Sequence, residues 1–249
     1  MKAMILAAGL GTRLKPLTDK VPKALVEVEG VPILERVIIK LKEQGFNKII
    51  VNVHHLASQI IAFLAAKDFE VEISISDESD ILLDTGGGIV KAMPLLYKDD
   101  DSPVLIHNVD IISNANLKEI INVKDGYGAT LLVNERESSR KLIFNKQMHL
   151  QGWHDLKNNV FRPEGFIQNE IYQELAFSGI YAMTKRGVEE MKKLMGEGKY
   201  SVMDYFLNDD RKLDILGKKQ AELKILDIGK PATLLQASAL LKDLDRDSN

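Results

Sequence analysis

The pattern of apolar and polar positions predicts alternating strands and helices along the first third of the chain. Short apolar runs at residues 3–8, 48–53 and 71–76 are typical of buried strands. Residues 32–44 and 57–66 lie between them and carry apolar side chains at helical spacing. This alternation predicts βαβ units and a parallel sheet that is covered by helices.

A further buried strand is expected at residues 104–109, after a glycine-rich loop at 77–88. Beyond residue 126 the regular alternation with helices stops, and the pattern predicts a mixed, partly antiparallel arrangement with a hairpin at 141–153 and a loop at 157–174. The remaining expected elements are strands at 128–133, 175–183, 213–217 and 222–227, helices at 89–96, 186–195 and 202–208, and an amphipathic helix that ends near Leu241.

These elements predict an α/β protein with a Rossmann-like, mixed, mostly parallel sheet and helices on both faces. A chain of 249 residues is long enough to bury one large core. We therefore expect a single domain over residues 1–249, built from two halves at 1–125 and 126–241. Residues 243–249 are expected to form a frayed polar tail.

Composition and charge limit the classes of partner that the chain is expected to bind. The net charge of −3 gives no general field for nucleic acid, and no apolar run approaches the ~20 residues of a membrane span. The first residues enter a strand without the plan of a signal peptide, and the absence of cysteine excludes disulfides and thiolate zinc sites. We expect a cytoplasmic protein that binds neither nucleic acid nor membrane, with the oligomeric state open.

The loop after the first expected strand carries the strongest candidate chemistry. Gly9 and Gly11 let the backbone approach a ligand closely, and successive N–H groups in such a loop form an anion-binding concavity. Arg13 adds a bidentate fork for phosphate, and Lys23 adds a compact charge. The spacing matches neither a dinucleotide fingerprint nor a P-loop. The residues alone therefore leave polyphosphate binding and a plain tight turn both open.

The complete string, G-x-G-T-R followed by Pro16, Thr18 and Pro22-Lys23, resembles the signature of the sugar-1-phosphate nucleotidyltransferases. The resemblance covers essentially the whole chain. It implies a nucleoside triphosphate and a sugar 1-phosphate as partners, with residues 1–125 as the nucleotide-binding half and residues 126–241 as the sugar-binding half. It also implies that Arg13 holds the outer phosphates, that Lys23 contacts the reacting phosphate, and that the triphosphate is wrapped by Leu6, Ala7, Ala8, Gly9, Gly11 and Thr12.

In the resembled family, the segment that corresponds to residues 77–88 packs on the nucleotide base. Gly86 and Gly87 are then the expected contacts of the base, and Glu78 is the expected reader of its edge. A carboxylate only accepts hydrogen bonds, so Glu78 would suit the ring N–H of uracil or of guanine without separating the two. From the residues alone, a merely flexible loop is the alternative.

Two aspartates follow expected strands. Asp110 ends a strand on the same sheet edge as the glycine loop, where ligands of open α/β sheets gather, although such an Asp can also form a turn or cap a helix. The sequence Asn108-Val109-Asp110 resembles the family's Asn-x-Asp element, which implies that Asn108 meets ribose or sugar and that Asp110 binds Mg²⁺. Asp227 matches the second metal-binding aspartate. Val109 and Lys230 depart from the usual Gly and Thr.

The strand at 175–183 carries the candidate sugar contacts. Phe177, Ser178, Gly179 and Tyr181 resemble the family segment whose backbone and aromatic ring touch the sugar. A plain strand with a glycine bulge is the alternative interpretation.

Two other polar clusters are expected to have structural roles rather than to bind a metal. Residues 99–101 are three aspartates, but they precede a strand, so a solvated acidic turn is favoured over a metal-binding D-x-D motif. His54 and His55 lack partners at zinc-ligand spacing and are expected to make polar loop contacts.

The resemblance implies a Mg²⁺-dependent nucleotidyl transfer from a nucleoside triphosphate to a sugar 1-phosphate, with release of pyrophosphate. The compact length and the segment LDTGGGIVKA are most similar to N-acetylmuramate-1-phosphate uridylyltransferases. Mannose- or heptose-1-phosphate guanylyltransferases are the alternative. A catalytically silent nucleotide-sugar-binding relative is a second alternative, which does not explain both Asp110 and Asp227. A glycosyltransferase of related fold is a third, which does not explain Arg13 and Lys23.

Overall fold

The computed structural model of the chain describes residues 1–164, 166 and 172–247. Four parallel strands from the first half form one side of a mixed sheet, namely β1 (Lys2–Leu6), β4 (Lys48–Val53), β5 (Glu72–Asp77) and β6 (Val104–Asn108). The second half adds β8 (Tyr127–Asn134), β9 (Arg140–Phe144), β10 (Leu150–Asp155), β11 (Val160–Arg162), β12 (Gln173–Met183) and β13 (Asp214–Lys219).

These ten strands form one sheet. Its main path runs β11-β10-β9-β12-β6-β1-β4-β5, while β8 pairs with β12 and β13. All pairings of β9, β10 and β12 are antiparallel, whereas β13 runs parallel to β8. The prediction of a mixed α/β sheet with a partly antiparallel second half is therefore confirmed.

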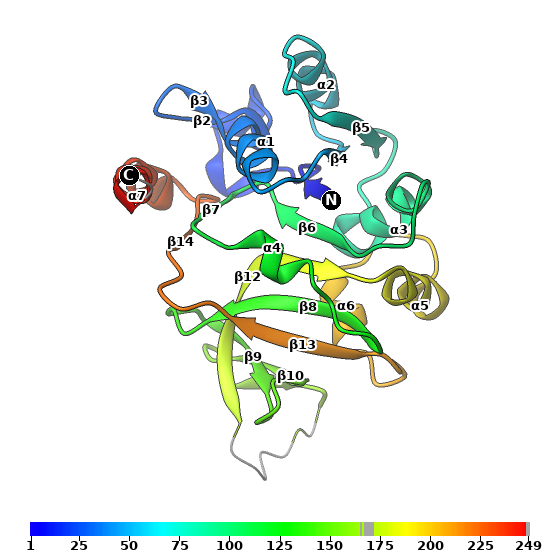
Figure 1. Ribbon diagram of the computed structural model, residues 1–249. Coiled ribbons are helices and arrows are strands. Elements are labelled where there is room, and N and C mark those ends of the chain that lie inside the picture. Colours follow the sequence, from blue (N-terminus) through cyan, green and yellow to red (C-terminus); the bar gives the residue numbers. More distant parts are fainter. Residues whose placement is uncertain (165, 167–171, 248–249) are drawn as a thin grey trace.

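Helices cover both faces of the sheet because successive strand residues point to opposite sides. Ile5 packs in a core with α1 (Ile33–Glu43) and α2 (Ala57–Ala65), whereas the neighbouring Met4 packs in a second core with α3 (Asp84–Leu96), α5 (Lys185–Met195) and α6 (Val202–Phe206). Figure 1 shows α1 and α2 beside β4 and β5 in the upper part of the view, with β9 and β10 at the bottom.

Short elements complete the described fold. They are the ribbon of β2 (Glu27–Val28) and β3 (Val31–Pro32), the pair of β7 (Ile111–Ser113) and β14 (Ile225–Asp227), and the helices α4 (Leu117–Ile120) and α7 (Pro231–Asp247). In the antiparallel pair of β14 and β7, Asp227 stands opposite Ile111. This pairing brings the end of the chain beside Asp110.

The structure corrects three expectations about elements. The glycines at 86–88 lie inside α3 rather than in a loop before it. The expected loop at 157–174 contains β11, and its residues 165 and 167–171 lie outside the described residues. The expected tail is helical as far as Asp247, because apolar residues such as Leu244 continue the packing face of α7, while residues 248–249 are not described.

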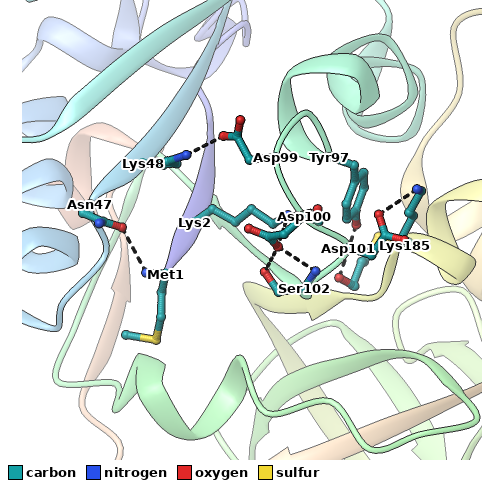
Figure 2. A network of polar contacts seen from close by, with 11 residues as sticks. Met1, Lys2, Asn47, Lys48, Tyr97, Asp99, Asp100, Asp101, Ser102 and Lys185 are labelled. Atoms are coloured by element: carbon teal, nitrogen blue, oxygen red, sulfur yellow. Dashed lines mark hydrogen bonds and ion pairs between the residues drawn. The ribbon is translucent and has the colours of Figure 1, made fainter.

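The three aspartates at 99–101 lie near the amino ends of β1 and β6, and they form ion pairs with lysines. Figure 2 shows this network, in which Asp99 pairs with Lys48, Asp100 with Lys2 and Asp101 with Lys185. Each carboxylate therefore has a lysine partner, as suits a surface turn rather than a metal motif. Among the described residues, no helix is long and apolar enough to cross a membrane.

Candidate functional site

A cavity of about 370 Å³ opens at the carboxyl ends of β1 and β6. Parallel strands gather their carboxyl ends at one edge, which is where open α/β sheets bind ligands. The cavity unites many of the residues that the sequence predicts, namely Leu6, Ala7, Ala8, Gly9, Gly11, Thr12, Lys23, Asn108 and Asp110. It is also lined by Asn52, Leu82, Asp84 and Thr85, which the sequence analysis did not propose as site residues.

The glycine loop is held by hydrogen bonds to its backbone. Gly11 has a φ of +63°, and its carbonyl oxygen accepts the Thr18 hydroxyl at 2.8 Å and the Leu14 N–H at 2.8 Å. The His55 Nε2 atom lies 2.9 Å from the Thr18 carbonyl oxygen. The two histidines thus make loop contacts, because His54 Nδ1 likewise lies 2.6 Å from the Glu78 carbonyl oxygen.

Asn52 supports the loop from the neighbouring strand. Its Oδ1 atom accepts the N–H groups of Ala7 at 2.6 Å and Ala8 at 3.2 Å, while its Nδ2 atom donates to Glu78 Oε1 at 2.7 Å. Asn52 is buried, and it is the one polar residue in the apolar run IIVNV, which is the signal that could have identified it. Because both the oxygen and the nitrogen of this amide form hydrogen bonds, the Asn52 side chain is held in one rotamer and in turn holds the loop in place.

Glu78, the predicted reader of the base, does not line the cavity. Its side chain is completely buried, and the carboxylate accepts from Asn52 and from the Leu83 N–H at 3.1 Å. Burial raises the pKa of Glu78, against the opposing effect of these two hydrogen bonds. Asp84, at the first turn of α3, does line the cavity, as Asp110 does.

Gly86 and Gly87, the predicted contacts of the base, pack against residues 198–200 and do not line the cavity. The N–H of Gly86 donates to the Tyr200 carbonyl oxygen at 2.9 Å. A Cβ atom on Gly87 would lie 1.8 Å from the Gly198 carbonyl oxygen, and one on Gly86 would lie 2.4 Å from the Tyr200 ring. These glycines therefore let α3 approach the segment before α6, which covers them.

Three of the four candidate catalytic residues, Arg13, Asp110 and Asp227, meet around Gly229. A Cβ atom built on Gly229 would lie 2.5 Å from Arg13 Nη2, 2.8 Å from Asp227 Oδ1 and 3.0 Å from Asp110 Oδ2. The backbone ties this cluster together, since the Ile228 N–H donates to the Asp110 carbonyl oxygen at 2.9 Å and the Gly229 N–H donates to Asp227 Oδ1 at 2.7 Å. Residues from the two ends of the chain thus form one group.

Each carboxylate of the cluster is paired with a cation. Lys23 Nζ forms a hydrogen-bonded ion pair with Asp110, and both side chains are nearly buried. Arg13 Nη2 lies 3.9 Å from Asp227 Oδ2 in a more open position, with 51% of the Arg13 side chain exposed. The buried pair fixes charge at the floor of the cavity, and the exposed arginine stands where a larger anion can reach it.

The residues of the predicted sugar-contact segment lie in different environments. Gly179, with a φ of +76°, lies against Asn108, because a Cβ atom there would be 2.8 Å from Asn108 Nδ2. Ser178 is buried and donates to the Leu132 carbonyl oxygen at 2.6 Å. Tyr181 is buried in the core, which raises its pKa above the usual range. Ser178 and Tyr181 therefore lie in the protein interior, and Phe177 lines a separate cavity.

Comparison with known proteins places this geometry in a family. The model of the family described as nucleotidyl transferase matches residues 2–142, which is more than half of the chain. N-acetylmuramate alpha-1-phosphate uridylyltransferase from Caulobacter vibrioides is 43% identical over 113 residues, covering 44% of this chain and 46% of its own. A probable mannose-1-phosphate guanylyltransferase from Oryza sativa is 31% identical over 189 residues, covering 74% of this chain and 50% of its own.

A solved structure shares the fold of this chain. The crystal structure of HddC from Yersinia pseudotuberculosis superposes with a TM-score of 0.75 at 23% identity, over 96% of this chain and 98% of the other. The matches to the curated relatives span about half the length of those proteins. On the match of the family model to residues 2–142, the chain belongs to the nucleotidyl transferase family.

Proposed function

We propose that this chain transfers a nucleotidyl group from a nucleoside triphosphate to a sugar 1-phosphate and releases pyrophosphate. The observation that carries the proposal is the meeting of Arg13, Asp110 and Asp227 around Gly229, with Lys23 paired to Asp110, beside a cavity lined by the glycine loop. A silent binding protein has no need of two cation–carboxylate pairs at the phosphate end of its cavity.

The chemistry requires positioning and charge more than covalent catalysis by the protein. An oxygen of the sugar 1-phosphate attacks the α-phosphorus, a new P–O bond forms, and the bond from the α-phosphorus to the bridging oxygen breaks as pyrophosphate leaves. Lys23 stabilises the charge that develops on the α-phosphate, and Arg13 holds the departing pyrophosphate. The acceptor phosphate is already an anion, so no general base is needed.

The donor set fits a divalent cation such as Mg²⁺. Among the described residues, no group of three or more His, Cys, Asp or Glu is placed to hold a metal. Mg²⁺, however, is commonly bound by one or two carboxylates together with water and substrate phosphates. Asp110 and Asp227 would hold it, since an oxygen of each lies within 3.0 Å of the position of a Gly229 Cβ atom. The bound ion supplies Lewis acidity and a template for phosphate oxygens.

The preferred substrates in this proposal are UTP and an N-acetylated sugar such as N-acetylmuramate 1-phosphate. The names of the 42–43% identical relatives support this choice. Guanylyl transfer to a mannose- or heptose-type phosphate is the second candidate, supported by the relatives that match over more of this chain. Asp84 replaces Glu78 as the proposed acceptor of a ring N–H, because its carboxylate lies at the cavity.

The test is a pyrophosphate-release assay with Mg²⁺, in which each nucleoside triphosphate is combined with a panel of sugar 1-phosphates. We expect release with UTP and an N-acetylated sugar phosphate. Release only with GTP and a mannose- or heptose-type phosphate would keep the reaction and change the substrate. Silence across the panel, with nucleotide binding intact, would overturn the proposal.

A further inference from the structure

Strands β7 and β14 form a small ribbon that carries both aspartates of the cluster. Asp110 directly precedes β7, and Asp227 is the last residue of β14, where it stands opposite Ile111. Each strand has three residues, and the ribbon is separate from the ten-stranded sheet. A two-stranded ribbon is at best marginally stable alone. Another element must therefore hold this ribbon if the two carboxylates are to keep their places.

Helix α1 supplies this support through polar side chains that are one turn apart. Lys40 Nζ donates to the carbonyl oxygen of Ser113, the last residue of β7, and lies 3.4 Å from Ser113 Oγ. Gln44 Nε2 donates to the Ala115 carbonyl oxygen at 3.0 Å, and Gln44 Oε1 accepts the Leu117 N–H at 2.7 Å. Side chains at i and i+4 lie on the same face of a helix, so one face of α1 holds the end of β7 and the segment after it. Figure 1 shows β7 and β14 side by side below α1.

Lys40 also lies close to the strand that precedes Asp110. Burial lowers the pKa of the His107 imidazole to about 3, and the charge of Lys40 contributes to this shift as the second cause. His107 lies on β6, whereas Ser113 lies on β7. The Lys40 ammonium is therefore near both of the strands that the turn with Asp110 connects.

The ribbon transmits this restraint to the two carboxylates. In its antiparallel register Ser113 stands opposite Ile225, two residues before Asp227, so a displacement of β7 at this point also displaces β14. At the other end of the ribbon, the Ile228 N–H donates to the Asp110 carbonyl oxygen at 2.9 Å. The positions of both aspartates therefore depend on where α1 holds β7.

We propose that Lys40 is a positioning residue for the transfer reaction, because its ammonium holds β7 against α1 and thereby sets the spacing of Asp110 and Asp227. This inference rests on the proposed function. Lys40 lies outside the lining of the cavity, so it acts through the ribbon and not on the substrates. A buried ammonium costs more free energy than an apolar side chain, but its hydrogen bonds are stronger than those of a neutral donor. Lysine is thus suited to fixing a backbone carbonyl group rather than to filling space.

A double-mutant cycle tests whether Lys40 acts through Asp110. The measured quantity is kcat for wild type, Lys40→Met, Asp110→Asn and the double variant, with Mg²⁺ and the substrate pair that the pyrophosphate-release assay identifies. We expect Lys40→Met to lower kcat by roughly tenfold, because small displacements of positioned groups are costly, while the KM for the nucleotide changes by less than about threefold. In the Asp110→Asn background the same change should lower kcat by less than about twofold, since coupled residues are not additive.

Two further variants complete the cycle. Lys40→Arg keeps a cationic donor and should restore part of the lost kcat. Lys42→Met is the matched control, because Lys42 lies on the same helix and pairs with Glu70 in an exposed position, so kcat should stay within about twofold of wild type. Wild-type kcat in Lys40→Met would overturn the inference. An equal loss with and without Asp110 would also overturn it, since Lys40 would then act independently of the cluster.

Amide hydrogen exchange tests the same inference without turnover. The measured quantity is the exchange rate of the Ile228 amide relative to that of Val51 in the middle of β4, which corrects for a change in global stability. We expect Lys40→Met to raise this ratio by roughly tenfold and Lys42→Met to leave it unchanged. An unchanged ratio in Lys40→Met would overturn the inference even if the transfer reaction stands. Inactivity of wild type with every substrate pair would instead overturn the proposed function, and the exchange ratio would still show whether Lys40 holds the ribbon.

Discussion

Asn52 and Glu78 are joined inside the protein by a hydrogen bond of 2.7 Å from Asn52 Nδ2 to Glu78 Oε1. The other end of the same amide accepts two N–H groups of the glycine loop. Glu78 thus acts on the cavity through Asn52, as a support for the loop. This explains how a buried carboxylate can sit beside a ligand cavity without facing it.

Replacing Asn52 by Ala should weaken nucleotide binding and destabilise the fold. The change leaves the N–H groups of Ala7 and Ala8 without their acceptor and Glu78 without a donor, which typically costs about 1–3 kcal/mol. Nucleotide affinity and the free energy of unfolding are the quantities to measure. Asn122→Ala, at an exposed position, is the control and should change stability by no more than about 0.5 kcal/mol. Unchanged affinity in Asn52→Ala would refute the support role.

Removing one charged group of the cluster should slow turnover without unfolding the chain. Arg13→Ala, Lys23→Ala and Asp110→Ala are each expected to reduce kcat by roughly 10²–10³, by analogy with the loss of one oxyanion-hole donor. Lys15→Ala removes an exposed cation of the same loop, paired with Asp19 on the surface, and should leave kcat within a few-fold. Near-wild-type turnover in all three cluster variants would contradict the assigned roles.

Gly229→Ala tests the geometry of the cluster without removing a charge. The added methyl group would lie 2.5 Å from Arg13 Nη2 and 2.8 Å from Asp227 Oδ1, so these groups must separate. We expect kcat to fall by roughly tenfold or more, since small displacements of positioned groups are costly. The exposed neighbour Lys230→Ala is the matched control for turnover and for thermal unfolding. Full activity in Gly229→Ala would show that the cluster tolerates looser packing than its contacts indicate.

Gly87→Ala tests the structural role of the glycines in α3. A Cβ atom at this position would lie 1.8 Å from the Gly198 carbonyl oxygen, a contact that forces the backbone to move. We expect a loss of stability of roughly 3 kcal/mol or more, at the upper end of single substitutions. In Gly9→Ala, nothing lies within 4 Å of the added atom, so its free energy of unfolding should be within about 1 kcal/mol of the wild-type value. Chemical denaturation of the two variants decides the point.

Lys40 should give the chain a measurable dependence of stability on pH. Its Nζ atom donates to Ser113, and burial lowers its pKa to about 8, although Glu43 opposes the shift. Between about pH 8 and pH 10 the unfolded chain therefore binds a proton that the folded chain does not, so stability rises with pH. Relative to Lys40→Met, wild type should gain on the order of 1–2 kcal/mol between pH 7 and pH 10. A constant difference in unfolding free energy would contradict the lowered pKa.

The alternation of apolar runs was sufficient to predict β1, α1, β4, α2, β5 and β6, because βαβ units have strong local patterns. The same holds for the glycine loop with Arg13 and Lys23, whose order along the chain is itself the signal. Asn52 could not be assigned, since a lone polar residue in a strand does not say which backbone groups it will meet. The packing of Gly86 and Gly87 against residues 198–200 could not be predicted, because that segment is distant in sequence and marked by no pattern.

The meeting of Asp227 with Arg13 illustrates the same limit. Each residue could be proposed from a local motif, but their contact depends on the pairing of β14 with β7, two three-residue strands whose register no periodicity defines. Tertiary pairing, rather than local propensity, determines this part of the site.

The most direct test of the account is the initial rate of pyrophosphate release by wild type and by Asp110→Asn, measured side by side with Mg²⁺, UTP and N-acetylmuramate 1-phosphate. The account predicts that wild type releases pyrophosphate only when both substrates and the divalent cation are present, and that Asp110→Asn is slower by roughly 10²–10³ while its fold is retained. Equal rates in the two proteins would contradict the central claim that the cluster around Gly229 carries out the transfer.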